Sequence, residues 1–149
     1  MPVKPIPDGF HAVTPYIVAS GVPRLIDFLK NAFGAEEMYR HARPDGTVMH
    51  AQVRIGDSFL MMGESQGEFK AMPCMFYMYV NDADAAYKRA MAAGGTQVMA
   101  PTTQFYGDRS GGVKDPCGNQ WWVATHVEDV SSEEMARRGE AAMKKGGHA

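Results

Sequence analysis

Apolar and polar positions in the first half of the chain follow the order strand, helix, strand, strand, strand. β-branched and aromatic residues at 13–18 predict a strand, and apolar residues recur at helical spacing over residues 25–33. Pro23 suits the first turn of this helix, and Gly34 suits its C-terminal cap. Three further strands are predicted at residues 37–43, 48–55 and 58–63, separated by turn residues. The pattern predicts a βαβββ module.

The second half repeats this order. A strand pattern at residues 74–80 leads into an alanine-rich helix that Asp82 can cap. Three more strand patterns follow at residues 96–100, 105–113 and 120–126. Tyr16 and Tyr77 occupy equivalent places, 61 positions apart. Since identity between the halves is low, the repeat rests on shared order and spacing.

These patterns predict an α+β fold built from two βαβββ modules, at residues 8–69 and 70–130, within one domain at 8–130. A separate C-terminal helix is predicted at residues 131–145, because Ser131 followed by Glu134 is a capping-box pattern. The length of 149 residues is typical of one domain, and 45% hydrophobic with 21% charged residues is ordinary globular composition.

Charge and cysteine content exclude several classes of partner. The net charge of −2 provides no electrostatic attraction to nucleic acid or to an anionic membrane. The chain shows no apolar run near the ~20 residues that a membrane helix needs, and no signal-peptide pattern. Cys74 and Cys117 are too few for a disulfide framework and lack zinc-site spacing. We therefore expect a cytoplasmic protein without a nucleic-acid or membrane partner.

Two stretches carry a family resemblance: IDFLKNAFGAE at residues 26–36 and YGDRSGGVKDPCGNQWWVATHVEDV at residues 106–130. With the order of elements, they resemble the vicinal oxygen chelate superfamily of glyoxalases, bleomycin-resistance proteins and extradiol dioxygenases. The second stretch is similar to the PhnB-like branch, whose members often show a YGDR element, a DPxG turn and an ATHxED ending. The resemblance spans nearly the whole chain. It implies that the modules form a glyoxalase-like half-open barrel around a cavity, which a second subunit often completes.

The resemblance also implies four ligand positions for a divalent metal, on four strands. In this chain they fall on Thr14, Met61, Met75 and Trp122. None of these side chains suits Mg²⁺, Ni²⁺ or Zn²⁺, and a one-residue slip adds only the thiol of Cys74. We therefore expect no metal and no other cofactor.

Strand alternation gives the same positions a different role. Thr14 and Tyr16 share one face, Met75 and Tyr77 share its counterpart, and Trp122 lies on the last strand. With Met61, this lining suits a flat or apolar small molecule. The alternative is that these side chains fill a closed barrel.

The YGDR element adds two candidate ligand contacts, Tyr106 and Arg109. Arg109 has the geometry to bind a ligand carboxylate through two hydrogen bonds. Alternatively, Asp108 and Arg109 form an ion pair that holds the loop.

His50, His126 and Glu128 are the candidate catalytic residues. Two histidines and a carboxylate can bind iron or zinc, and a single histidine can act as a general base near neutral pH. Either histidine can equally be a hydrogen-bonded structural residue, and Glu128 can simply precede the last helix.

The function predicted first is binding of a small organic ligand in a cavity lined by methionine and aromatic side chains, without the usual metal site. A homodimer is expected, because half-open barrels expose apolar faces. The alternative is a glyoxalase-like lyase or isomerase with a relocated or absent metal. A third possibility is an accessory module whose cavity has closed.

Overall fold

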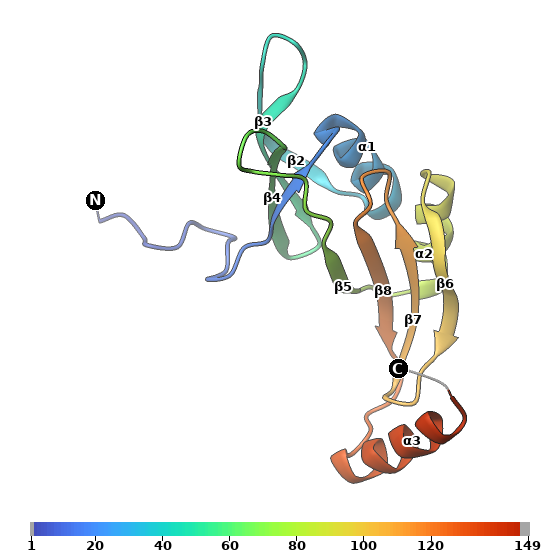
Figure 1. Ribbon diagram of the computed structural model, residues 1–149. Coiled ribbons are helices and arrows are strands. Elements are labelled where there is room, and N and C mark those ends of the chain that lie inside the picture. The colour runs from blue at the N-terminus through green and yellow to red at the C-terminus, as the bar shows by residue number, and fades with distance from the viewer. Residues whose placement is uncertain (1, 147–149) are drawn as a thin grey trace.

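The protein contains two modules of one helix and four strands each, followed by a C-terminal helix, in a computed structural model that describes residues 2–146 (Figure 1). The first module comprises β1 (Tyr16–Ala19), α1 (Val22–Phe33), β2 (Glu36–Ala42), β3 (Val48–Ile55) and β4 (Ser58–Glu64). The second comprises β5 (Met75–Tyr79), α2 (Ala83–Ala92), β6 (Thr96–Thr103), β7 (Asp108–Lys114) and β8 (Gln120–His126). The last helix is α3 (Ser132–Lys144). The predicted α+β fold is confirmed.

Each module forms its own four-stranded sheet, in the order β1-β4-β3-β2 for the first and β5-β8-β7-β6 for the second. The first strand of each sheet runs parallel to the last, which pairs Tyr16 with Met61 and Tyr77 with Trp122. Both members of the second pair lie 61 positions after those of the first. The constant offset seen in the sequence therefore corresponds to one strand register repeated in two sheets.

The first strand is shorter than predicted, because it begins at Tyr16 rather than at residue 13. Proline has no backbone N–H to donate, so Pro15 joins the sheet only through its carbonyl, which accepts from Met61 N at 2.9 Å. Thr14 lies before the strand, and its hydroxyl donates to the His11 carbonyl at 3.3 Å. The expectation that Thr14 shares a strand face with Tyr16 is therefore wrong.

The helix boundaries follow the predicted caps. α1 has a proline in its first turn and ends at Gly34, whose φ of 67° is the left-handed conformation that glycine adopts most easily. The Asp82 side chain accepts from Ala85 N at the start of α2. The Ser131 hydroxyl accepts from Glu134 N at the start of α3, as the capping box predicts.

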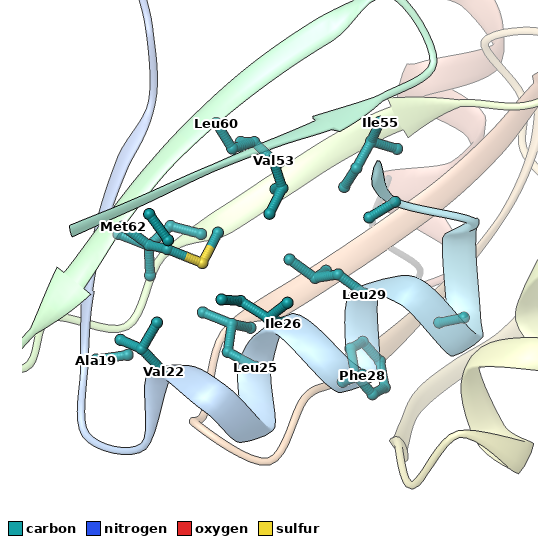
Figure 2. Close-up of a cluster of buried hydrophobic side chains, with 14 of the residues drawn as sticks. Ala19, Val22, Leu25, Ile26, Phe28, Leu29, Val53, Ile55, Leu60 and Met62 are labelled. Carbon is teal, nitrogen blue, oxygen red and sulfur yellow. The ribbon is translucent and has the colours of Figure 1, made fainter. Parts of the chain in front are cut away.

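The main apolar core lies between the helix-covered faces of both sheets, and a smaller cluster of Ala83, Ala86 and Val123 lies beside it under α2. Figure 2 shows Leu25, Ile26 and Leu29 of α1 beneath Val53 and other side chains of β3 and β4. The same core includes residues of the second module, namely Ala90 of α2, Val113 of β7 and Trp121 of β8. The modules are therefore joined through their helices rather than through a continuous sheet.

The opposite face of each sheet has no helix on it and points away from this core; we call it the open face. Residues that alternate with the core residues lie there, such as Tyr16 on β1 and Trp122 on β8. The two sheets do not close into a barrel.

α3 lies at the far end of the second sheet from α1 (Figure 1). It is held by Arg138, whose guanidinium donates to the Glu128 carboxylate at 2.8 and 2.9 Å and to the Phe105 carbonyl at 3.2 Å. Within residues 2–146, no helix is both long enough and apolar enough to cross a membrane.

The shared core gives a direct prediction for stability. Phe28 of α1 is 2% exposed, so Phe28→Ala is expected to lower the free energy of unfolding by about 3 to 5 kcal/mol through lost burial and a new cavity. Phe69→Ala removes the same ring from a residue that is 67% exposed. It is expected to change the free energy of unfolding by less than about 1 kcal/mol. Urea denaturation measures both. Separate unfolding of the two modules would contradict a shared core.

Candidate functional site

The open face of the first sheet contains a pocket of about 510 Å³. Tyr16, Met49, His50 and Phe69 are among the side chains that line it. The Tyr16 hydroxyl lies 3.2 Å from His50 Nδ1. Gly63 makes this arrangement possible, because a Cβ at that position would come within 2.8 Å of the Tyr16 hydroxyl oxygen. The pocket is therefore mainly apolar, and its polar groups are the Tyr16–His50 pair, Glu64 and Gln66.

The open face of the second sheet contains a polar cluster around a buried carboxylate. Asp108 is 3% exposed, and its Oδ2 accepts from the hydroxyls of Tyr77 at 2.7 Å and Tyr79 at 2.9 Å. Asp108 Oδ1 lies 2.8 Å from His126 Nδ1. The other ring nitrogen of His126 lies 2.8 Å from a carboxylate oxygen of Asp129. We call Tyr77, Tyr79, Asp108 and His126 the tyrosine–aspartate cluster.

Small residues leave room for the aromatic rings on this face of the sheet. Tyr77 and Tyr79 are on β5 and Asp108 is on β7, so the rings must cross the intervening strand β8. There the register partner of Tyr79 is Ala124, whose side chain is only a methyl group. On β7, a Cβ at Gly112 would come within 2.8 Å of the Trp122 indole. The sequence of β7 and β8 thus determines where the rings can rest.

Arg109 lies on the other side of the sheet. Its guanidinium donates to both carboxylate oxygens of Asp84 on α2, at 2.7 and 3.0 Å. Neighbouring strand residues point to opposite faces, so Asp108 and Arg109 do not pair with each other. The sequence interpretation of an Asp108–Arg109 ion pair is therefore wrong. The structure also separates Arg109 from the other predicted ligand contacts.

Tyr106 lies in the turn before β7, which begins at Asp108 rather than at residue 105. Gly107 makes the turn with a φ of 98°, and a Cβ there would collide with the Glu128 carbonyl. The Tyr106 side chain is close enough to Tyr77 to help raise the pKa of its phenol. The structure therefore places Tyr106 beside the tyrosine–aspartate cluster.

The three candidate catalytic residues do not come together. His50 lies on the first sheet, and His126 lies on the second. The carboxylate of Glu128 binds Arg138 of α3. Glu128 does not share a strand face with His126, because β8 ends at His126 and the next two N–H groups both donate to the Gly107 carbonyl. Among residues 2–146, no three His, Cys, Asp or Glu side chains are grouped so that they could hold a metal ion.

Comparisons with known proteins match this architecture. Residues 9–123 match the Glyoxalase/Bleomycin resistance protein/Dioxygenase superfamily. The chain belongs to this superfamily. The uncharacterized protein Mb0911c of Mycobacterium bovis is 34% identical over 135 residues, which cover 83% of this chain and 89% of that protein.

Two solved structures share the fold. TioX from Micromonospora sp. ML1 has a TM-score of 0.64 at 22% identity and covers 78% of this chain and 100% of its own. A PhnB protein from Bacillus cereus has a TM-score of 0.62 at 17% identity, and the match covers 77% of this chain and 99% of that protein. The glyoxalase-like fold is therefore confirmed, and PhnB proteins are among its structural neighbours.

In this superfamily member, three of the four positions at which the resemblance expects metal ligands lie on the sheets, one on the first and two on the second. Met61 is the register partner of Tyr16 on the first sheet. Met75 and Trp122 lie on the second sheet, where Trp122 Nε1 donates to the Gln120 side chain at 3.1 Å. Thr14 precedes β1. Each open face therefore presents thioether or aromatic groups at these positions.

The tyrosine–aspartate cluster shifts the pKa of each of its members. Burial acts to raise the pKa of Asp108, but the hydrogen bonds from His126, Tyr77 and Tyr79 outweigh it and lower that pKa. The hydrogen bonds to Asp108 and then to Asp129 raise the pKa of His126. Burial, followed by the bond to Asp108, raises the pKa of Tyr77, so both hydrogen bonds to the carboxylate come from protonated phenols.

Asp108 is a candidate functional residue that the sequence does not single out. The sequence suggests it only as an ion-pair partner of its neighbour Arg109. Strand alternation could have corrected this, because residues 108, 110 and 112 share the face that carries Trp122 and His126 across the β7–β8 register. The contacts with Tyr77 and Tyr79 have no such signal, since they cross an intervening strand.

The raised pKa of His126 predicts a pH dependence of stability. The contribution of His126 is expected to be fully present below pH 6.5 and to be lost as the pH rises through its raised folded-state pKa. The wild type should therefore lose stability relative to His126→Gln over that interval. Urea denaturation at a series of pH values measures the difference in free energy of unfolding between the two proteins. A difference that does not change with pH would contradict this prediction.

Proposed function

We propose that this superfamily member binds a small, flat or apolar organic molecule against the open faces of its sheets. In this proposal no metal takes part, because methionine and tryptophan stand at three of the four positions where the family resemblance expects metal ligands. A second copy of the chain covers the open faces and completes the cavity.

The observation that carries the proposal is the exposure of large apolar side chains on the open faces. Met49 and Phe69 beside the first sheet are 50% and 67% exposed, and Met75 and Tyr79 on the second are 63% and 64% exposed. Apolar groups gathered on one face of a protein indicate a binding surface, whereas scattered ones do not. Methionine and aromatic side chains adapt well to a planar ligand.

The pocket on the first sheet supports the same function. Its volume of about 510 Å³ lies within the range typical of small-molecule sites. The Tyr16–His50 contact supplies the polar group that orients a ligand in such sites.

Binding of a neutral planar probe tests this proposal. We expect 2-naphthol to bind the wild type and to bind Met49→Glu at least about tenfold more weakly, because the new carboxylate would have to lose water against an apolar ligand. The matched control is Met143→Glu on α3, whose side chain is 77% exposed and lies outside both open faces. Isothermal titration calorimetry measures the affinities. Absence of binding to the wild type, or equal weakening by both variants, would contradict the proposal.

The oligomeric state of the protein tests whether a second copy covers the open faces. We expect the wild type to sediment as a dimer at micromolar concentration, and Met75→Glu to shift it toward monomer by placing charge on an open face. Met143→Glu is again the control and should remain dimeric. Sedimentation velocity separates the two species. A monomeric wild type would contradict the proposal that a second copy covers the open faces.

A further inference from the structure

The tyrosine–aspartate cluster has a chemistry that an apolar ligand would not use. Both phenols donate their only hydrogen to Asp108 Oδ2. The phenol oxygens therefore have only lone pairs left to offer, and donation to a carboxylate makes an oxygen a better acceptor. Any further partner of these two oxygens has to be a hydrogen-bond donor.

Three aromatic rings lie on the same sheet face as this pair of acceptors. The Tyr77 and Tyr79 rings meet edge to face, with centroids 5.5 Å apart at 75°. Their side chains remain 43% and 64% exposed, so part of their π surface is available. Trp122, half-buried, lies on the same face over Gly112. The faces of such rings attract positive charge.

The charges around the cluster are negative in either protonation state of His126. The imidazole lies between two carboxylates, those of Asp108 and Asp129. One negative charge is left over when His126 is protonated, and two when it is neutral. Within the described residues, neither carboxylate forms an ion pair with a lysine or arginine.

A buried hydroxyl on the same face lacks a partner. Ser110 is 1% exposed, and its Oγ has no hydrogen-bond partner within the described part of the chain. It is two residues after Asp108 on β7, and its register partner is Ala124, which is also the partner of Tyr79. Buried polar atoms are rarely left unsatisfied, so in the residues that the structure describes this oxygen lacks a partner that such atoms usually have.

We propose that the tyrosine–aspartate cluster binds the positively charged nitrogen of an organic amine, with the rest of the ligand lying against Trp122 and Met75. The ammonium N–H groups donate to the phenol oxygens, the rings face the cation, and the carboxylates balance its charge. This inference rests on the proposed function, because it assigns one chemical group of the ligand to the second sheet.

Three probes of similar shape and different charge test it: benzylammonium, benzyl alcohol and benzoate. We expect benzylammonium to bind the wild type about tenfold more tightly than benzyl alcohol, and benzoate to bind most weakly. Asp108→Asn, which keeps the shape of the side chain and removes its charge, should reduce that preference to less than about twofold. Calorimetric titration at neutral pH gives the three affinities.

Control variants separate recognition from misfolding. Tyr79→Phe keeps the ring but removes one acceptor. It should weaken the binding of benzylammonium more than the binding of benzyl alcohol. Asp27→Asn removes an exposed carboxylate on α1 and should leave the preference unchanged. Circular dichroism shows whether each variant is folded. If Asp108→Asn does not fold, the affinities of Tyr79→Phe test the proposal instead.

The possible outcomes also distinguish this inference from the proposed function. Equal affinities for benzylammonium and benzyl alcohol, or a preference that survives in both Asp108→Asn and Tyr79→Phe, would overturn the amine site. The proposed function would still stand if 2-naphthol binds. Failure of 2-naphthol to bind would count against the proposed function, whatever the amine does.

Discussion

The packing of Trp121 is the interaction on which the rest of the structure depends. Its indole stacks on Phe76 of the same sheet, with centroids 4.4 Å apart, and meets Phe33 of the first module at 5.6 Å. Its Nε1 donates to the buried carboxylate of Asp115 at 2.8 Å. Burial of this large side chain joins the two modules, and its hydrogen bond fixes the turn before β8. Because neighbouring strand residues alternate, placing Trp121 in the core also places Trp122 on the open face.

The position of the core determines what the protein can bind. Both helices and the helix-covered faces of both sheets contribute to one core, so the two open faces point outward from it. Apolar side chains on those faces are only partly buried by the folding of a single chain. They are instead available to a ligand or to a second copy, which is why exposure rather than burial carries the functional argument here.

The tyrosine–aspartate cluster shows how a buried charge is tolerated on such a face. Burial alone would favour the neutral form of Asp108, but two phenols and an imidazole donate to its oxygens and stabilise the carboxylate. This arrangement fixes the rings of Tyr77 and Tyr79 across β8 and uses up their hydrogens. The cluster therefore combines a structural role, ring orientation, with a chemical one, a surface of acceptors.

The sequence by itself determined the order of elements, the repeat at an offset of 61, one cap of each helix (Gly34, Asp82 and Ser131) and the resemblance to the superfamily. These are local properties, since periodicity, turns and caps depend on residues close in the chain. It also predicted that Met75 and Tyr77 share one strand face. Only the tertiary structure decided that the open faces turn away from one another and that His50 and His126 belong to different sheets. It also decided that Asp108 pairs with His126 while Arg109 turns to α2. Each of these depends on contacts between strands or helices distant in sequence, and alternation along one strand does not specify them.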